Sequence, residues 1–235
     1  MKVKTENLID FLGKATVGGV IIDALLDFGH DGLRIVAFDE SHTGGVNGLM
    51  YKDGNFQDYT EMQVPIKDTA KLIRLLKMND GEAELLIKDD AFHIIGNNFE
   101  GAIGMAKIEN LKCPIPAEKW PRLGYERGFE IDGSILANAK KTAGNLGSNK
   151  ITATVKDGLF TIQVGEGTAN RGIAKARVKY GDVAVVYGNI LLDFAKVIKG
   201  KVRVAFKDDN PMVITSEDEN SIVEWMIAPV LPSGK

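Results

Sequence analysis

The side chains best suited to metal or nucleophilic chemistry in this sequence are three histidines and one cysteine. His30, His42 and His93 lie far apart along the chain, and none has metal-ligand spacing to another histidine or to Cys113. No base lies near Cys113 in the sequence to activate it as a nucleophile. The acidic run at residues 217–219 is typical of a solvated turn between strands. These residues predict no catalytic site, no metal and no cofactor.

Basic residues suggest a different chemistry, the binding of phosphate, because they gather in four helix-like stretches. Lys71, Arg74 and Lys77 recur at three-residue intervals, so they lie on roughly one helix face. Basic residues in last turns also complement helix dipoles, which is explanation enough for any single helix. If the four helices face one surface, that surface would bind double-stranded DNA without reading its sequence. The eight candidate DNA contacts are Lys14, Lys71, Arg74, Lys77, Lys140, Lys141, Lys196 and Lys199.

The elements that carry these residues repeat at an offset of about half the chain. Residues 83–90 (AELLIKDD) reappear as residues 202–209 (VRVAFKDD), and both are strand-like runs that end in a turn. Each follows a helix-like stretch, at 68–77 or at 189–199, whose first residue is a suitable N-cap. We therefore expect each half to contain the same strands and helices in the same order.

A second match lies earlier in each half. Residues 22–26 lead to the turn Asp31-Gly32, and residues 151–155 lead to the turn Asp157-Gly158. An Asp-Gly between alternating runs predicts a hairpin. Both runs again follow helix-like stretches, and four matching elements in one order make a chance resemblance the minority interpretation.

A proline-rich stretch divides the two halves. Three of the seven prolines fall within residues 111–126, which favours an extended connector between domains at 1–110 and 127–235. Two helices packed on antiparallel sheet give each domain an α+β fold. Exposed sheet edges on two such domains would favour pairing with further copies of the chain.

Composition limits the classes of function. The net charge is −3, which argues against a domain that grips DNA tightly in a groove. No apolar run approaches the roughly 20 residues that a membrane helix needs, and residues 1–6 contain no apolar signal core. The single cysteine fits a reducing compartment. These features predict an intracellular protein with no membrane partner.

Two stretches resemble a known family. Residues 31–42 (DGLRIVAFDESH) are similar to the signature of proliferating cell nuclear antigen (PCNA), the DNA sliding clamp of archaea and eukaryotes. Ile227-Ala228-Pro229-Val230 resembles that family's terminal segment, and the strand at 210–213 also matches. The resemblance covers essentially the whole chain in order.

The resemblance implies a homotrimeric ring of six domains that encircles duplex DNA and catalyses no reaction. It would tether a DNA polymerase and other proteins with a clamp-interaction motif for replication and repair, and a clamp loader would load it. It implies cytoplasmic protein at the nucleoid in an archaeon, or nuclear protein in a eukaryote. The implied partner-peptide pocket comprises Phe38, Val46, Cys113, Ile115, Pro116, Pro211, Ala228 and Pro229. Gly44-Gly45, where the family usually has a bulky apolar residue, would make this pocket shallower.

The resemblance also implies two edge strands for contact between subunits, at residues 102–108 and 172–179. The expected contact residues are Ile103, Met105, Ile108, Ile173, Lys175 and Arg177. Taken alone, both are ordinary exposed edges on which basic residues prevent aggregation.

Three other interpretations stay open from the sequence. One is a monomeric or hetero-oligomeric relative of the clamps, such as a checkpoint or viral processivity factor. Another is a two-domain enzyme with an unrecognised site between its domains. The third is a scaffold that binds only proteins.

Overall fold

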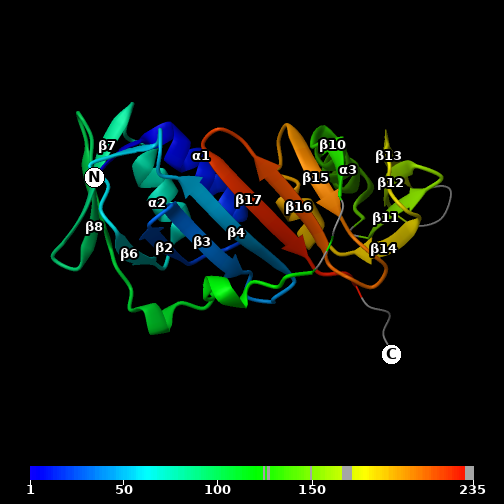
Figure 1. Ribbon diagram of the computed structural model, residues 1–235, viewed down its shortest axis with the longest axis horizontal. Coiled ribbons are helices and arrows are strands. Elements are labelled where there is room, and N and C mark those ends of the chain that lie inside the picture. The colour runs from blue at the N-terminus through cyan, green and yellow to red at the C-terminus, as the bar shows by residue number, and fades with distance from the viewer. Residues whose placement is uncertain (124, 126–127, 149, 166–170, 231–235) are drawn as a thin grey trace. The chain divides into compact units, whose positions relative to one another are not determined.

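The computed structural model describes residues 1–123, 125, 128–148, 150–165 and 171–230 (Figure 1). By its internal contacts the chain divides into two compact units. The first comprises Met1–Pro121 and Glu217–Val223, and the second comprises Arg122–Ser216 and Glu224–Lys235. Residues 124 and 126 of the expected connector, and residues 231–235 of the tail, lie outside the described residues.

The first unit contains two helices and two antiparallel sets of strands. One set has the order β5-β1-β7-β8-β9 and the other the order β4-β3-β2-β6. Helices α1 and α2 contact each other, and α1 also contacts β4 (Figure 1). Along the chain the elements are β1 (Lys2–Lys4), α1 (Thr5–Ala15), β2 (Ala24–Gly29), β3 (Gly32–Phe38), β4 (Gly44–Tyr51), β5 (Phe56–Gln57), β6 (Met62–Ile66), α2 (Thr69–Leu76), β7 (Glu82–Lys88), β8 (Ala91–Ile95) and β9 (Glu100–Gly104).

The second unit repeats this plan. Its strands have the orders β13-β12-β11-β14 and β10-β15-β16. A last strand, β17 (Ser221–Ile227), is shared, because residues 221–223 belong to the first unit and residues 224–227 to the second. The elements are β10 (Phe129–Asp132), α3 (Ser134–Leu146), β11 (Ile151–Lys156), β12 (Leu159–Val164), β13 (Gly172–Arg177), β14 (Val183–Tyr187), α4 (Ile190–Phe194), β15 (Lys201–Ala205) and β16 (Met212–Glu217).

The predicted α+β fold and internal repeat are therefore confirmed. The order of elements is the same in both units: a strand, a helix, four strands, a second helix and a final run of strands. The short β5 of the first unit is not counted in this comparison. The Asp-Gly turns lie between β2 and β3 and between β11 and β12, where the sequence places them. Asp157 has a positive φ of 50°, which suits the tight turn of a hairpin.

The apolar faces of the helices form the cores. Leu8, Phe11 and Leu12 of α1 are buried in the first unit, and Leu72 and Leu76 of α2 are buried with them. In the second unit Phe160, Tyr187 and Phe206 are fully buried, and Phe129 packs edge-on against Phe206. Because the buried side chains of α1 and α2 recur at three- and four-residue spacing, the opposite faces of these helices remain exposed.

The helix expected at 189–199 is shorter in the structure than predicted. Helix α4 ends at Phe194, because the N–H groups of Lys196 and Val197 bond to carbonyls three residues back rather than four. Such bonds tighten the chain into turns. Asn189, the expected cap, makes no side-chain cap bond.

The cap expected for the helix at 68–77 is confirmed. The Asp68 carboxylate accepts a hydrogen bond from the Lys71 backbone N–H at 2.7 Å. We predict that Asp68→Ala lowers the free energy of unfolding by about 1 kcal/mol, because the helix loses a partner for one of its first N–H groups. Urea unfolding followed by circular dichroism measures this change.

The matched control is Asn189→Ala, which removes a helix-preceding side chain that makes no cap bond. Equal losses in the two variants would contradict this account of the Asp68 cap.

Candidate functional site

The first part of the expected connector is bonded to the end of β3. The Phe38 N–H donates to the Cys113 carbonyl at 2.9 Å, and the Ile115 N–H donates to the Val36 carbonyl at 3.0 Å. Ala37 and Pro114 form the bridge between these two bonds. Residues 113–115 are therefore extended, as the prolines predict, and they join the edge of β3 through one isolated bridge.

A buried carboxylate anchors the start of this segment. Asp23 is 2% exposed, and its two oxygens accept the backbone N–H groups of Lys112 at 2.9 Å and Cys113 at 2.8 Å. The Lys112 ammonium also pairs with Glu40 at 3.0 Å on the surface. Because the buried Asp23 carboxylate accepts both of these backbone N–H groups, it fixes where the connector meets the sheet.

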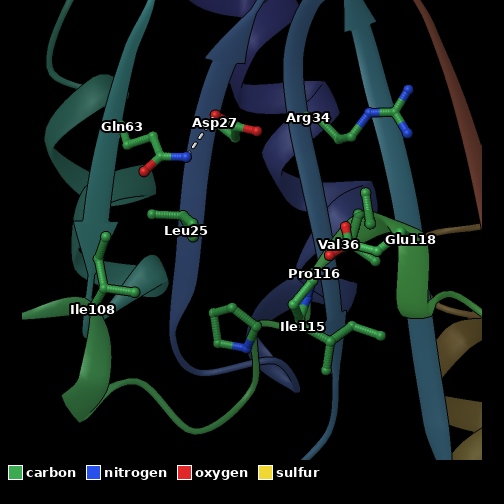
Figure 2. Close-up of a pocket in the computed structure, with 11 residues that line it drawn as sticks. Leu25, Asp27, Arg34, Val36, Gln63, Ile108, Ile115, Pro116 and Glu118 are labelled. Atoms are coloured by element: carbon green, nitrogen blue, oxygen red, sulfur yellow. Dashed lines mark hydrogen bonds between the residues drawn. The ribbon is translucent and has the colours of Figure 1, made fainter.

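A groove of about 370 Å³ lies between this connector and the outward faces of β2, β3 and β6 (Figure 2). Its apolar lining includes Leu25 and Ile108, and Ile108 is 50% exposed. Its polar lining includes Asp27, which accepts a hydrogen bond from the Gln63 amide at 3.1 Å. Apolar walls with a few polar groups are typical of sites that bind a ligand or a peptide side chain. The remaining lining residues are Arg34, Val36, Pro114, Ile115, Pro116, Ala117 and Glu118.

An aromatic cluster lies at the other end of the connector. The Trp120 ring stacks on Phe38 with centroids 5.5 Å apart and an interplanar angle of 28°, and His42 lies against Phe38 at 5.8 Å. A Cβ atom on Gly45 would lie 2.7 Å from the Phe38 ring and 3.0 Å from the Trp120 ring. The space that a side chain at Gly45 would take is therefore occupied by these two rings.

The loop that carries His42 is held by Asp39. This carboxylate is 6% exposed and accepts hydrogen bonds from the N–H and hydroxyl of Ser41, the hydroxyl of Thr43 and the N–H of Gly44. Burial raises the pKa of Asp39, but these bonds lower it overall. The Asp-x-Ser-His part of the sequence signature is thus a self-bonded loop beside Phe38.

The residues expected in the partner pocket fall into two groups. In the first unit Phe38, Ile115 and Pro116 have accessible surface, whereas Val46 and Cys113 are 0% and 1% exposed and belong to the core. In the second unit Pro211, Ala228 and Pro229 are half-buried, and Pro229 forms a bridge with Tyr187.

Three of the expected DNA contacts lie together in the first unit. Lys71 and Arg74 on α2, and Lys77 directly after it, are all exposed, while Leu72 and Leu76 point into the core. Their only acidic neighbour within ion-pair range in the described part of the chain is Asp68, which lies 3.9 Å from Arg74. This exposed row carries three positive charges.

Lys14 differs from that row. Its ammonium is bound between Asp10 at 2.6 Å and Asp218 at 2.8 Å, and its side chain is 11% exposed. Burial lowers the pKa of Lys14, but the bonds to Asp10 and Asp218 raise it overall. The ion pairs give Lys14 a structural role, so it is a weaker candidate for phosphate than the exposed basic residues.

The remaining basic candidates lie in the second unit, on α3 or after α4. Lys141, Lys196 and Lys199 are exposed, and Lys140 is half-buried. Burial and the positive charge of Lys196 both lower the pKa of Lys140. These two lysines are therefore close enough to repel each other, and a bound anion would relieve that repulsion.

Both strands in which the sequence predicts subunit contacts lie at the edge of a sheet. β9 ends one strand order and β13 ends another. Exposed side chains on β13 are Ile173, Lys175 and Arg177, and β9 exposes Glu100. These edges offer unpaired backbone groups and opposite charges.

Three of the six expected subunit contacts are not exposed on these edges. Ile103 lies on β9 but is 5% exposed. β9 ends at Gly104, because the N–H groups of Met105 and Ala106 bond to the carbonyls of Asp90 and Pro65. Met105 and Ile108 consequently lie beyond the edge strand, and Ile108 lines the groove instead.

Sequence reasoning missed Asp23 and Trp120 as parts of this site. Asp23 had a signal, since a single carboxylate inside an otherwise apolar strand-like run indicates a buried anchor. The aromatic residue between prolines in the connector was a signal for Trp120.

No described helix is long and apolar enough to cross a membrane.

Comparison with known proteins supports the resemblance seen in the sequence. The chain is 28% identical over 143 residues to a protein named DNA polymerase sliding clamp 1 of Sulfolobus acidocaldarius. That match spans 60% of this chain and 54% of the relative, so it covers about half of the relative's length. No protein-family model matches the chain.

Solved structures match over nearly the whole chain. A proliferating cellular nuclear antigen from Entamoeba histolytica is 18% identical with a TM-score of 0.81, and 98% of each chain is covered. A PCNA from A. fulgidus bound to the C-terminal region of FEN-1 is 17% identical with a TM-score of 0.77, covering 99% of each chain. A PCNA2–PCNA3 complex from Sulfolobus tokodaii is 17% identical with a TM-score of 0.75, covering 97% of this chain and 99% of that chain. The chain therefore has the PCNA fold.

The environment of Cys113 gives a prediction about its reactivity. Burial raises the pKa of this thiol to about 11. We predict that iodoacetamide alkylates Cys113 in the folded protein far more slowly at pH 8 than in urea, because the thiolate is the nucleophile. Mass spectrometry over time measures the difference, and equal rates in the two conditions would contradict the burial.

The direction of the pH dependence follows from the same shift. At pH values below the pKa of the unfolded thiol, the contribution of Cys113 to the free energy of unfolding is complete. This contribution is lost as the pH rises through about 11, the pKa of the thiol in the folded protein.

Proposed function

We propose that this chain is one subunit of a DNA sliding clamp, a ring that encircles duplex DNA and tethers replication and repair proteins to it. The observation that carries the proposal is the PCNA fold over nearly the whole chain. The match to a DNA polymerase sliding clamp supports it from the sequence side. A clamp of this kind catalyses no reaction of its own.

The proposed DNA-binding surface consists of the exposed basic residues of the helices and the turn after α4. They are Lys71, Arg74, Lys77, Lys140, Lys141, Lys196 and Lys199. These side chains would contact phosphates through charge alone, which gives weak binding that salt reduces and that no base sequence directs. Weak contacts suit a protein that must slide.

The proposed ring forms by pairing of sheet edges between copies. Strands β4 and β17 are neighbours, and the Tyr51 N–H at the end of β4 donates to the carbonyl of Asn220, directly before β17, at 2.9 Å. In the repeat, β13 corresponds to β4 and β9 corresponds to β17. We expect β9 of one copy to pair with β13 of the next, in the same way.

The charges on the two edges favour this pairing. Glu100 on β9 would face the basic side of β13 that carries Lys175 and Arg177. A contact between two different surfaces of the same chain joins copies head to tail. The copies close into a ring when the rotation from one copy to the next allows it. A homotrimer is the closed form that the family resemblance implies.

Partner proteins would dock beside the connector. Ile115 and Pro116 have accessible surface and line the groove shown in Figure 2, so they are candidates to contact an apolar side chain of a clamp-interaction motif. A polymerase and a clamp loader are the partners implied by this function. Pro211, Ala228 and Pro229 remain candidate contacts from the second unit.

Other interpretations have weaker support. Among the described residues no His, Cys, Asp and Glu side chains gather as metal ligands would. A scaffold that binds only proteins gives no reason for an exposed row of three basic residues on α2. A monomeric clamp relative would share the fold but leave both edges unpaired.

The test is retention on circular duplex DNA. A clamp remains on nicked circular DNA during gel filtration and is lost after the DNA is cut once, because a ring slides off an end. We predict that replacing Lys71, Arg74 and Lys77 by alanine shortens retention on the circle severalfold, with the largest effect at low salt, where the lost phosphate contacts are least screened. The circular dichroism spectrum should not change, since all three side chains are exposed.

The matched control replaces three exposed lysines of the same unit that lie off the helices, Lys88, Lys107 and Lys119. Equal retention of the helix variant and this control would contradict the DNA-binding surface. Equal retention on circular and cut DNA would contradict the clamp.

A further inference from the structure

The groove beside the connector has an apolar floor (Figure 2). Leu25 on β2 and Val36 on β3 line it, whereas Leu26 and Ile35 point to the other face of the sheet and are fully buried in the core. Ile108 stands at the side of the floor and is 50% exposed. An aliphatic side chain that comes from outside can therefore bury its surface here.

The connector wall of the groove offers no free backbone N–H. Pro114 and Pro116 have none, and the N–H of Ile115 between them is bonded to the Val36 carbonyl at 3.0 Å. Polar contacts with a bound partner must consequently come from side chains at another part of the lining.

Those side chains lie in one row across three strands. Asp27 on β2 is in register with Gln63 on β6 and with Arg34 on β3. The Gln63 amide donates a hydrogen bond to the Asp27 carboxylate at 3.1 Å. Arg34, by contrast, forms no hydrogen bond or ion pair through its side chain with any residue that the structure describes. The row thus contains a carboxylate with a partner and a guanidinium without one.

This difference decides which charge a docked partner must supply. A partner that covers the groove removes water from the row, and a charged group left without a hydrogen-bond partner then weakens binding. Asp27 keeps its bond to Gln63, whereas Arg34 would be left without an acceptor. A carboxylate is the complementary group, because its two oxygens accept parallel N–H groups of a guanidinium. A cation beside Arg34 would be repelled.

We infer that this groove binds a short peptide segment of a partner protein that carries an aliphatic side chain and, beside it, an acidic residue. The aliphatic side chain lies on Leu25, and the carboxylate pairs with Arg34. The inference rests on the proposed function, in which partners dock beside the connector, and it adds the chemical class of the docking segment. It assigns Leu25 and Arg34 as specificity-determining residues.

The experiment selects peptides on the full-length protein. A phage library of random short peptides is panned on the wild-type protein, on Arg34→Glu and on the control Lys88→Glu, which reverses an exposed charge of the same unit away from the groove. Sequencing should show enrichment of an aliphatic residue beside Asp or Glu on the wild type and on Lys88→Glu. On Arg34→Glu, Lys or Arg should replace the acidic residue.

The most enriched peptide, labelled with fluorescein, then gives the affinity. Anisotropy titration should show about tenfold weaker binding to Arg34→Ala, which corresponds to about 1.4 kcal/mol. Replacing the acidic residue of the peptide by alanine should weaken binding to the wild type by a similar factor but leave binding to Arg34→Ala unchanged, because the pair is then already lost. Leu25→Ala should also weaken binding severalfold.

Selected peptides without an acidic residue, or the same selection on Arg34→Glu as on Lys88→Glu, would overturn the inference. A selection that enriches no peptide would overturn it as well. Retention on circular DNA distinguishes these results from a failure of the clamp function, because Leu25 and Arg34 lie neither on the basic surface nor on β9 or β13. Wild-type protein that is not retained would contradict the clamp, whatever the peptides show.

Discussion

The unpaired edges of the sheets are the constraint on which this protein depends. Every strand needs partners for its backbone N–H and C=O groups, and the repeated plan of the two units satisfies most of them internally. β9 and β13 are among the strands that end a sheet and have one free side. A strand with a free edge pairs with another copy unless something blocks it. The proposed ring is the assembly in which the free edges of β9 and β13 are both paired.

The connector shows a second use of the same principle. β3 pairs with β2 near the Asp31-Gly32 turn, and residues 113–115 bond to its other end. Asp23 takes up the two N–H groups at the point where the connector joins, and Trp120 covers Phe38 further along. A segment that links two domains thereby becomes one wall of the groove to which partners are proposed to bind.

The sequence was sufficient for the fold because the fold depends on local patterns. The alternation of apolar residues, the two Asp-Gly turns and the repeated Lys-Asp-Asp all act over a few residues, and the structure confirms the elements they predict. The length of α4 was wrong because its end is decided by hydrogen bonds of the following turn, which apolar spacing does not report. The extent of the strand expected at 102–108 was wrong because bonds from Met105 and Ala106 to distant carbonyls end β9 at Gly104.

The site was harder to predict, since it depends on contacts between distant residues. Lys14 looks like the other helix lysines in the sequence, but Asp218 comes from the other end of the chain to bind it. Val46 and Cys113 match the family's pocket by position, yet both are buried in this chain. Gly45 reads as a missing side chain, and only the placement of the Trp120 ring shows what fills the space.

The central claim is that the two free edges pair between copies to close a ring. The most direct measurement is solution mass by size-exclusion chromatography with light scattering. The chain has a mass of 25.5 kDa, so the account predicts a particle of three times that mass, 76.5 kDa. A particle of 25.5 kDa across the accessible concentration range would contradict it, because both edges would then remain unpaired in solution.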